Sequence, residues 1–164
     1  ERRCAMGGNG AYDEEWGGVP IEKRKFIEMD TRIDGHKILV NAQTPGHKST
    51  PENSNSDSPI YLCGIVDKKT GDIKITTVAI YSKHLLVKTI DLDFDDNGEL
   101  KPFRSYKKNG KIKTDGTHGH DMPADSQGVV GRKRHDAKNT YQVDLNNELL
   151  KKIVEFNKRH NKWK

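Results

Sequence analysis

The chain has 164 residues, enough for one domain, and only 32% of them are apolar, so we expect a small hydrophobic core. It carries 29 Lys and Arg against 24 Asp and Glu, a net charge of +5, which favours an anionic partner. No apolar run approaches the roughly 18 residues that a membrane span needs, so we expect a soluble protein without a membrane segment.

Residues 1–35 are predicted to form an arm that carries one short helix. The first half of this segment is rich in glycine and lacks hydrophobic periodicity, and no signal-peptide pattern is visible. Because the sequence begins at Glu1 and not at Met, we expect it to be a fragment or a processed piece. Pro20 suits the first position of a helix, which we expect to continue to about Met29. The remainder, 36–164, is predicted to be a single α+β domain.

The middle of the chain is predicted to form an antiparallel meander of four or five strands. Residues 36–41 are a short strand or the approach to one, and residues 43–59 are polar enough to form a long loop. Period-two alternation and β-branched residues then predict strands at Ile60–Val66, Ile73–Tyr81 and Leu86–Phe94. Turn sequences are present at Lys68–Asp72, Asp95–Gly98 and Lys107–Lys111. In the third strand we expect one face to hold Ile90, Leu92 and Phe94 and the other to hold Thr89, Asp91 and Asp93.

A helix is predicted near the end of the sequence. Apolar residues recur at helical spacing from Leu145 to Trp163, and we expect the helix to cover about 145–160. Asp144 is the expected N-cap. The predicted fold is therefore α+β, an antiparallel β-meander packed with a short N-terminal helix and a C-terminal helix.

Several common chemistries are excluded because their sequence motifs are absent. Cys4 and Cys63 are far apart and no CxxC pair exists, which argues against a zinc site built on cysteines. The two cysteines either form a disulfide or are unrelated thiols. The sequence also has no P-loop, no GxGxxG after a strand, no GxSxG, no HExxH and no zinc-deaminase pattern.

The sharpest candidate site is the sequence Thr-His-Gly-His-Asp at 117–121. In an extended backbone, His118 and His120 point to the same face because side chains two residues apart do so. Imidazoles titrate near neutral pH, so such a pair can act as general base and general acid. Cleavage of RNA by attack of a 2′-hydroxyl on the adjacent phosphate needs a pair of this kind. A surface His-x-His sequence without a role is the alternative interpretation.

Other polar residues are candidates for holding the phosphate. His84 follows a strand edge, and we predict it to be the third catalytic residue. The candidate substrate-binding residues are Arg104, Arg132, Lys133, Arg134, Thr140, Tyr141 and His47. The basic run that contains three of them is equally compatible with a solvated surface, His47 with a bland polar loop, and Tyr141 with a partly buried core aromatic.

The order of these motifs resembles that of small ribonuclease toxin domains of the barnase–EndoU–colicin–RelE group. Such domains lie at the C-terminal ends of polymorphic toxins and phage-head-associated effectors. The motifs are, in chain order, the loop from Gln43 to His47, the meander, Ser82–His84, Gly116–Asp121 and the basic run Gly131–His135.

The resemblance covers about residues 36–164 and implies both a fold and an activity. The implied fold is a curved antiparallel sheet packed on N-terminal helical material. The implied activity is that of a toxin-type endoribonuclease that cleaves RNA (tRNA or rRNA) without a metal or other cofactor. The resemblance implies catalytic roles for His118 and His120 first, and then for His84.

The same resemblance implies a setting for this activity. The protein would be a secreted or delivered effector that acts in the cytoplasm of a target cell during bacterial competition. A basic active face is most readily covered by an acidic protein, so we expect an acidic immunity protein as a partner.

Two other functions stay open. One is a metal-dependent nuclease of the HNH type, with His118, His120 and Asp121 at the metal and Asn139 and a later histidine completing the motif. The other is a basic nucleic-acid-binding or structural module without activity. RNA cleavage that resists EDTA, metal-dependent nicking of DNA, and salt-sensitive binding without cleavage would distinguish the three.

Overall fold

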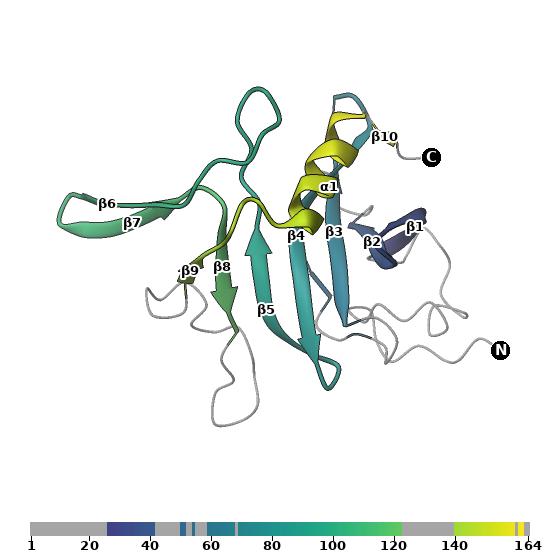
Figure 1. Ribbon diagram of the computed structural model, residues 1–164, viewed down its shortest axis with the longest axis horizontal. Coiled ribbons are helices and arrows are strands. Elements are labelled where there is room, and N and C mark those ends of the chain that lie inside the picture. The colour runs from purple at the N-terminus through teal and green to yellow at the C-terminus, as the bar shows by residue number, and fades with distance from the viewer. Residues whose placement is uncertain are drawn as a thin grey trace.

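The computed structural model describes residues 26–41, 50–51, 54, 59–67, 69–122, 140–159 and 161–162. In this part of the chain, one mixed sheet carries a helix on one face and a separate two-stranded hairpin projects to the side (Figure 1). The strands are β1 (Phe26–Ile33), β2 (His36–Asn41), β3 (Ile60–Val66), β4 (Asp72–Ser82), β5 (Leu85–Asp91), β6 (Arg104–Lys108), β7 (Lys111–Asp115), β8 (His118–Asp121), β9 (Thr140–Gln142) and β10 (Asn161–Lys162), and the helix is α1 (Glu148–Lys158). The sheet has the order β1-β2-β3-β4-β5-β8-β9, with β10 also on β4, and β6 pairs with β7 apart from it.

The predicted α+β class is confirmed, with more strands than the four or five expected. Strands β3, β4 and β5 form three consecutive strands of the predicted four- or five-stranded meander, and β3 has the predicted bounds. The chain then leaves the sheet for the β6–β7 hairpin, whose turn residues Asn109 and Gly110 both have positive φ, as the Asn-Gly sequence predicts. It returns as β8, which pairs with β5. Strand β2 pairs with β3 in parallel, which the prediction of a purely antiparallel sheet did not include.

The prediction of an N-terminal helix that reaches Met29 is wrong for the residues that the structure describes. Phe26–Ile33 is strand β1, antiparallel to β2, so the sheet begins before residue 36. Asp34 and Gly35 have positive φ (53° and 80°) and form the two-residue turn between these strands. Pairing with the buried strand β2 overrides the local helix signal at Pro20, which itself lies outside the described residues.

Apolar side chains pack on both faces of the sheet. The face under α1 buries Ile38, Val40, Leu62, Ile73, Ile75, Val78 and Leu92 against Leu150, Ile153 and Phe156 of the helix. The opposite face buries Phe26, Leu39, Tyr61, Cys63, Ala79, Tyr81, Leu86 and Met122. Ile90 and Phe94 pack on the same core as Leu92, which confirms the predicted alternation and turns Asp91 to the face opposite α1.

The C-terminal helix is present, but its start differs from the prediction. α1 is capped by Asn147, whose side-chain oxygen accepts hydrogen bonds from the backbone N–H groups of Leu149 (2.9 Å) and Leu150 (3.3 Å). The expected cap, Asp144, instead accepts from the backbone N–H of Asn146 in the preceding turn. Within the described ranges, no helix combines the length and the apolar character that crossing a membrane demands.

Cys63 lies in the core of the sheet face opposite α1 and is 1% exposed. Burial raises the pKa of its thiol to about 12, so the group stays protonated and unreactive at neutral pH. Cys4 lies outside the described residues, and Cys63 is a free, buried thiol, which favours the second predicted alternative, two unrelated thiols.

The edge of β4 that faces β5 is closed by three successive partners. β10 pairs at Ile73, and β5 pairs from Thr77 onward. Between them, the side chain of Asn157 in α1 takes the place of a strand. Its oxygen accepts from the backbone N–H of Ile75 at 2.8 Å, and its NH₂ group donates to the backbone carbonyl of Ile75 at 3.0 Å. One amide side chain therefore joins the helix to the central strand.

We expect Asn157→Ala to destabilise the protein by about 1–3 kcal/mol, because it leaves a backbone N–H and C=O in the interior without their partner. Chemical denaturation followed by circular dichroism measures this. Glu155→Ala, on the exposed side of the same helix, is the matched control and should change little. An Asn157→Ala variant as stable as this control would show that the amide does not hold the helix to β4.

Candidate active site

The two histidines singled out in the sequence do face the same side of a strand. They lie on β8, their ring centroids are 4.5 Å apart, and the Nε2 atoms of His118 and His120 are 3.0 Å apart. The pairing of β8 with β5 places His118 opposite Asp91 and His120 opposite Thr89. The prediction of a shared face is therefore confirmed.

Asp91 completes the cluster. Its Oδ2 lies 3.0 Å from Nε2 of His120 and 3.9 Å from Nε2 of His118. The sequence had placed Asp91 on the polar face of its strand but gave no sign of this contact. The contact depends on β8 returning to pair with β5 after the β6–β7 excursion, and local periodicity carries no information about such a pairing.

The ring orientation of His118 is fixed by a hydrogen bond at Nδ1, the ring nitrogen that faces away from the cluster. Its Nδ1 lies 2.7 Å from the carbonyl oxygen of Gly116. A carbonyl only accepts, so Nδ1 carries the proton, and in the neutral ring Nε2 presents its lone pair to the cluster. Gly116 has φ of 84°, and a Cβ there would lie 1.9 Å from the carbonyl oxygen of Pro102, so glycine is required for this support.

Exposure differs sharply among the three side chains. The side chain of His120 is 3% exposed, that of His118 is 15% exposed and that of Asp91 is 35% exposed. A substrate can therefore approach His118 and Asp91, while His120 lies behind them.

The two candidates on β9 turn to opposite faces. Thr140 pairs with His120, and so lies on the histidine face. Tyr141 pairs with Gly119 and crosses it on the other face, where a Cβ at residue 119 would lie 2.2 Å from the ring. The side chain of Asp121 also turns away from the histidines, and its carboxylate accepts from Lys88 Nζ at 2.7 Å. Neither Tyr141 nor Asp121 thus belongs to the cluster, which removes Asp121 from the place that the HNH alternative gave it.

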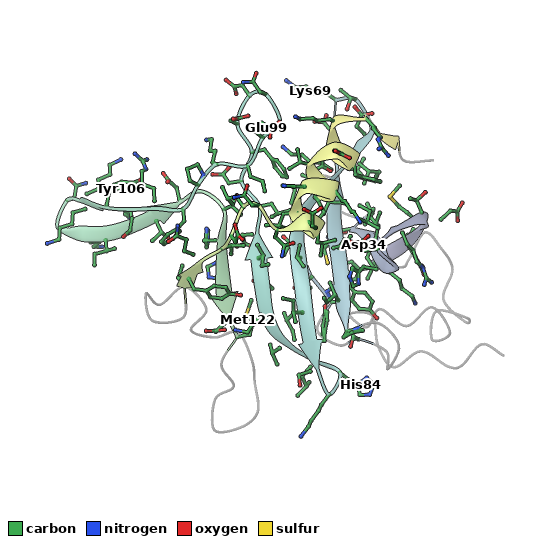
Figure 2. All side chains as sticks on the ribbon, viewed as in Figure 1. Asp34, Lys69, His84, Glu99, Tyr106 and Met122 are labelled. Carbon is green, nitrogen blue, oxygen red and sulfur yellow. The ribbon has the colours of Figure 1, made fainter. Side chains whose placement is uncertain are left out.

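His84 is not brought to the histidine pair. It lies in the β4–β5 turn, as Figure 2 shows. Its φ is 71°, and its Nδ1 is 2.7 Å from the carbonyl oxygen of Ser54. Strand β5 separates this turn from Asp91, a distance of about 20 Å at the usual rise of about 3.3 Å per residue. The prediction that His84 contacts the same phosphate is not supported by this placement.

Arg104 lies at the base of the β6–β7 hairpin and is committed to an ion pair. Its Nε and one terminal nitrogen donate to the two carboxylate oxygens of Asp115 at 3.2 and 2.7 Å. These hydrogen bonds lower the pKa of the Asp115 carboxyl and raise that of the guanidinium. The hairpin is nevertheless next to the cluster, because the ring of Phe103 lies 6.0 Å from that of His118. The candidates His47, Arg132, Lys133, Arg134 and Asn139 lie outside the described residues.

No protein-family model, curated protein or solved structure matches this chain.

We expect Gly119→Ala to destabilise the protein by about 1–3 kcal/mol, because the new methyl group overlaps the ring of Tyr141. In the Tyr141→Ala background the same substitution should cost much less. Equilibrium unfolding of the two single variants and the double variant measures the coupling. Additive losses would show that the ring does not rest on Gly119.

Proposed function

We propose that this chain is an endoribonuclease that cleaves RNA at the Asp91–His118–His120 cluster. The observation that carries the proposal is the convergence of two imidazoles and a carboxylate within 3.9 Å at the root of an exposed basic hairpin. The cluster can act on a phosphodiester, and the hairpin can hold the polyanion that contains it.

Strands β6 and β7 supply the positive charge. Every residue of β6 is exposed, and so is most of β7, so neither strand contributes to the core. The cations of this hairpin are Arg104, Lys107, Lys108, Lys111 and Lys113. Against them stands only Asp115 within the two strands, and Figure 1 shows the hairpin projecting beyond the sheet. Such a surface attracts a nucleic acid through its phosphates.

One face of the hairpin has the composition of a single-strand binding surface. Cross-strand pairing puts Tyr106 opposite Lys113 and Lys108 opposite Lys111. Tyr106 lies out on the hairpin in Figure 2 and offers an aromatic ring, on which the Arg104 guanidinium already stacks at 4.5 Å. Aromatic and cationic side chains side by side bind the bases and phosphates of single strands.

Lys108 and Lys111 point to the same conclusion through their mutual repulsion. Like charges directly opposite each other on a β-ladder destabilise it. A phosphate between them would remove this repulsion, so the pair favours an anion-bound state. The hairpin leads directly to the cluster, since only Gly116 and Thr117 separate β7 from His118.

The mechanism drawn from the sequence needs one revision. In-line attack by the 2′-oxygen places the attacking and leaving oxygens on opposite sides of phosphorus. Two Nε2 atoms 3.0 Å apart do not face both oxygens at once, and His120 is buried. We therefore assign proton transfer at the 2′-hydroxyl and the phosphate to the partly exposed members, His118 and Asp91, and place the buried His120 as their support.

His118→Ala should lower the rate of RNA cleavage by at least about two orders of magnitude, the usual contribution of a group that acts in proton transfer. The assay is cleavage of a labelled RNA by the full chain, with thermal unfolding as a check on folding. His36→Ala, at the start of β2 and remote in the sheet order, is the matched control and should cleave like wild type.

The toxin-type role adds a second measurement to the same variants. Tightly controlled expression of the wild type in bacteria should arrest growth and degrade cellular RNA, while His118→Ala should do neither. Full RNase activity of purified His118→Ala would remove the cluster from the reaction and refute the proposal.

The double variant Lys108→Gln/Lys111→Gln should bind RNA more weakly while the hairpin itself becomes slightly more stable. Loss of two phosphate contacts lowers the slope of log affinity against log salt by about 1.4 for single strands. KM should therefore rise at moderate salt with little change in kcat. Lys69→Gln/Lys151→Gln removes the same charge from exposed positions elsewhere and is the control. Equal effects from the two double variants would mean that net charge, not the hairpin, attracts the RNA.

A further inference from the structure

We infer that Asp91, His118 and His120 form a binding site for a divalent transition-metal ion of the zinc class. The inference deepens the proposed function, because it names a cofactor for the same cluster; only the role of the ion in RNA cleavage rests on that function. It also departs from the metal-independent activity that the sequence resemblance implies.

The spacing of the three candidate ligand atoms fits a metal ion. Nε2 of His118, Nε2 of His120 and Oδ2 of Asp91 are separated by 3.0, 3.0 and 3.9 Å. Zinc binds imidazole nitrogen and carboxylate oxygen at about 2.0–2.2 Å with tetrahedral geometry, which places ligand atoms about 3.3–3.5 Å apart. The observed separations bracket this value. Across the described ranges, this is the one group of three or more His, Cys, Asp or Glu side chains whose ligand atoms all lie within 4.8 Å of one another.

The orientation of His118 also suits a metal ligand. The Gly116 carbonyl accepts the proton of Nδ1, so the lone pair of Nε2 points into the cluster. A metal-binding histidine usually donates its other N–H to a carbonyl or carboxylate in this way, which fixes the ring and its tautomer. The glycine at 116, whose Cβ would overlap Pro102, keeps that carbonyl in place.

The three candidate ligands all lie on one side of the site. All three stand on the paired strands β5 and β8, with Asp91 directly opposite His118, so their backbone positions are rigid. His120 is buried while His118 and Asp91 are partly exposed. An ion held here would have protein on one side and free coordination positions on the other, which is the arrangement of a catalytic zinc site with three protein ligands and water.

The ligand set also selects the class of metal. Two imidazoles and one carboxylate suit zinc, cobalt, nickel and iron, whereas magnesium and calcium prefer oxygen ligands alone. The site should therefore discriminate strongly against magnesium.

A bound ion would supply a positive charge for the scissile phosphate and a bound hydroxide that acts as a base near neutral pH. The hydroxide would take the proton of the 2′-hydroxyl as the O2′–P bond forms. The P–O5′ bond would break, and the 5′-oxygen would take a proton from water. The products are a 2′,3′-cyclic phosphate and a 5′-hydroxyl, so atoms and charge balance without a redox partner.

The test uses the full chain without a histidine tag, stripped of metal by a chelator and dialysed. Titration with Co²⁺ should produce visible d–d absorption that saturates at one ion per chain, and calorimetry with Zn²⁺ should give the same stoichiometry. Loss of a group that hydrogen-bonds to a metal ligand typically costs 10–100-fold in metal affinity. His118→Ala, His120→Ala and the isosteric Asp91→Asn, which remove or weaken a ligand itself, should each cost at least that much. His36→Ala should bind like wild type, and Mg²⁺ should not compete.

A thermal shift keeps the test decisive if His120→Ala unfolds. Zn²⁺ should raise the melting temperature of the wild type and not that of Asp91→Asn, whose shape is unchanged. Absence of Co²⁺ and Zn²⁺ binding, or equal binding by wild type, His118→Ala and Asp91→Asn, would overturn the inference.

Metal binding and RNA cleavage can fail separately. Metal binding without RNA cleavage would leave the site standing and remove the nuclease. Undiminished RNA cleavage by the stripped protein in EDTA would retain the nuclease and refute the catalytic role of the ion.

Discussion

The pairing of β8 with β5 is the constraint on which the candidate site depends. It sets Asp91 beside His118 and brings His120 into the same cluster. A slip of one residue would turn both histidines to the face that packs under α1. The register is held at one end by Thr117, whose hydroxyl accepts from the backbone N–H of Asp93 and donates to its carbonyl. At the other end, the ion pair of Lys88 with Asp121 closes the ladder on the α1 side of the sheet, away from the histidines.

The two faces of the sheet divide the work of the domain. The α1 face holds the larger of the two hydrophobic clusters, and Asn157 ties the helix to the central strand at Ile75. The opposite face is free to hold polar chemistry at its β5–β8 end. A single strand serves both, since Ile90 packs toward the core while its neighbour Asp91 joins the histidines. The cluster is thus held on rigid elements and not on loops, which is what a precise arrangement of ligands requires.

Sequence patterns predicted what depends on near neighbours. β3 and the alternation around Asp91 were correct because period-two burial is local. The shared face of His118 and His120 was correct for the same reason. The predicted helix reaching Met29 was wrong, because pairing with β2 decides that segment. The Asp34-Gly35 sequence, which suits a two-residue hairpin turn, was the local signal for this pairing. The prediction that His84 lies near the phosphate is not supported either, because a position next to a strand edge does not say which end of the sheet the residue occupies.

The β6–β7 hairpin has a consequence for how such a domain can change over time. None of the residues of these two strands is buried, so their side chains are not constrained by the core. Substitutions there can accumulate without loss of the fold, provided that the Asn109–Gly110 turn is kept. The core and the β5–β8 ladder tolerate far less. If the hairpin binds a polyanion as proposed, its preference for one polyanion over another can drift rapidly while the Asp91–His118–His120 cluster stays fixed, and related chains would then differ most in this one projecting arm.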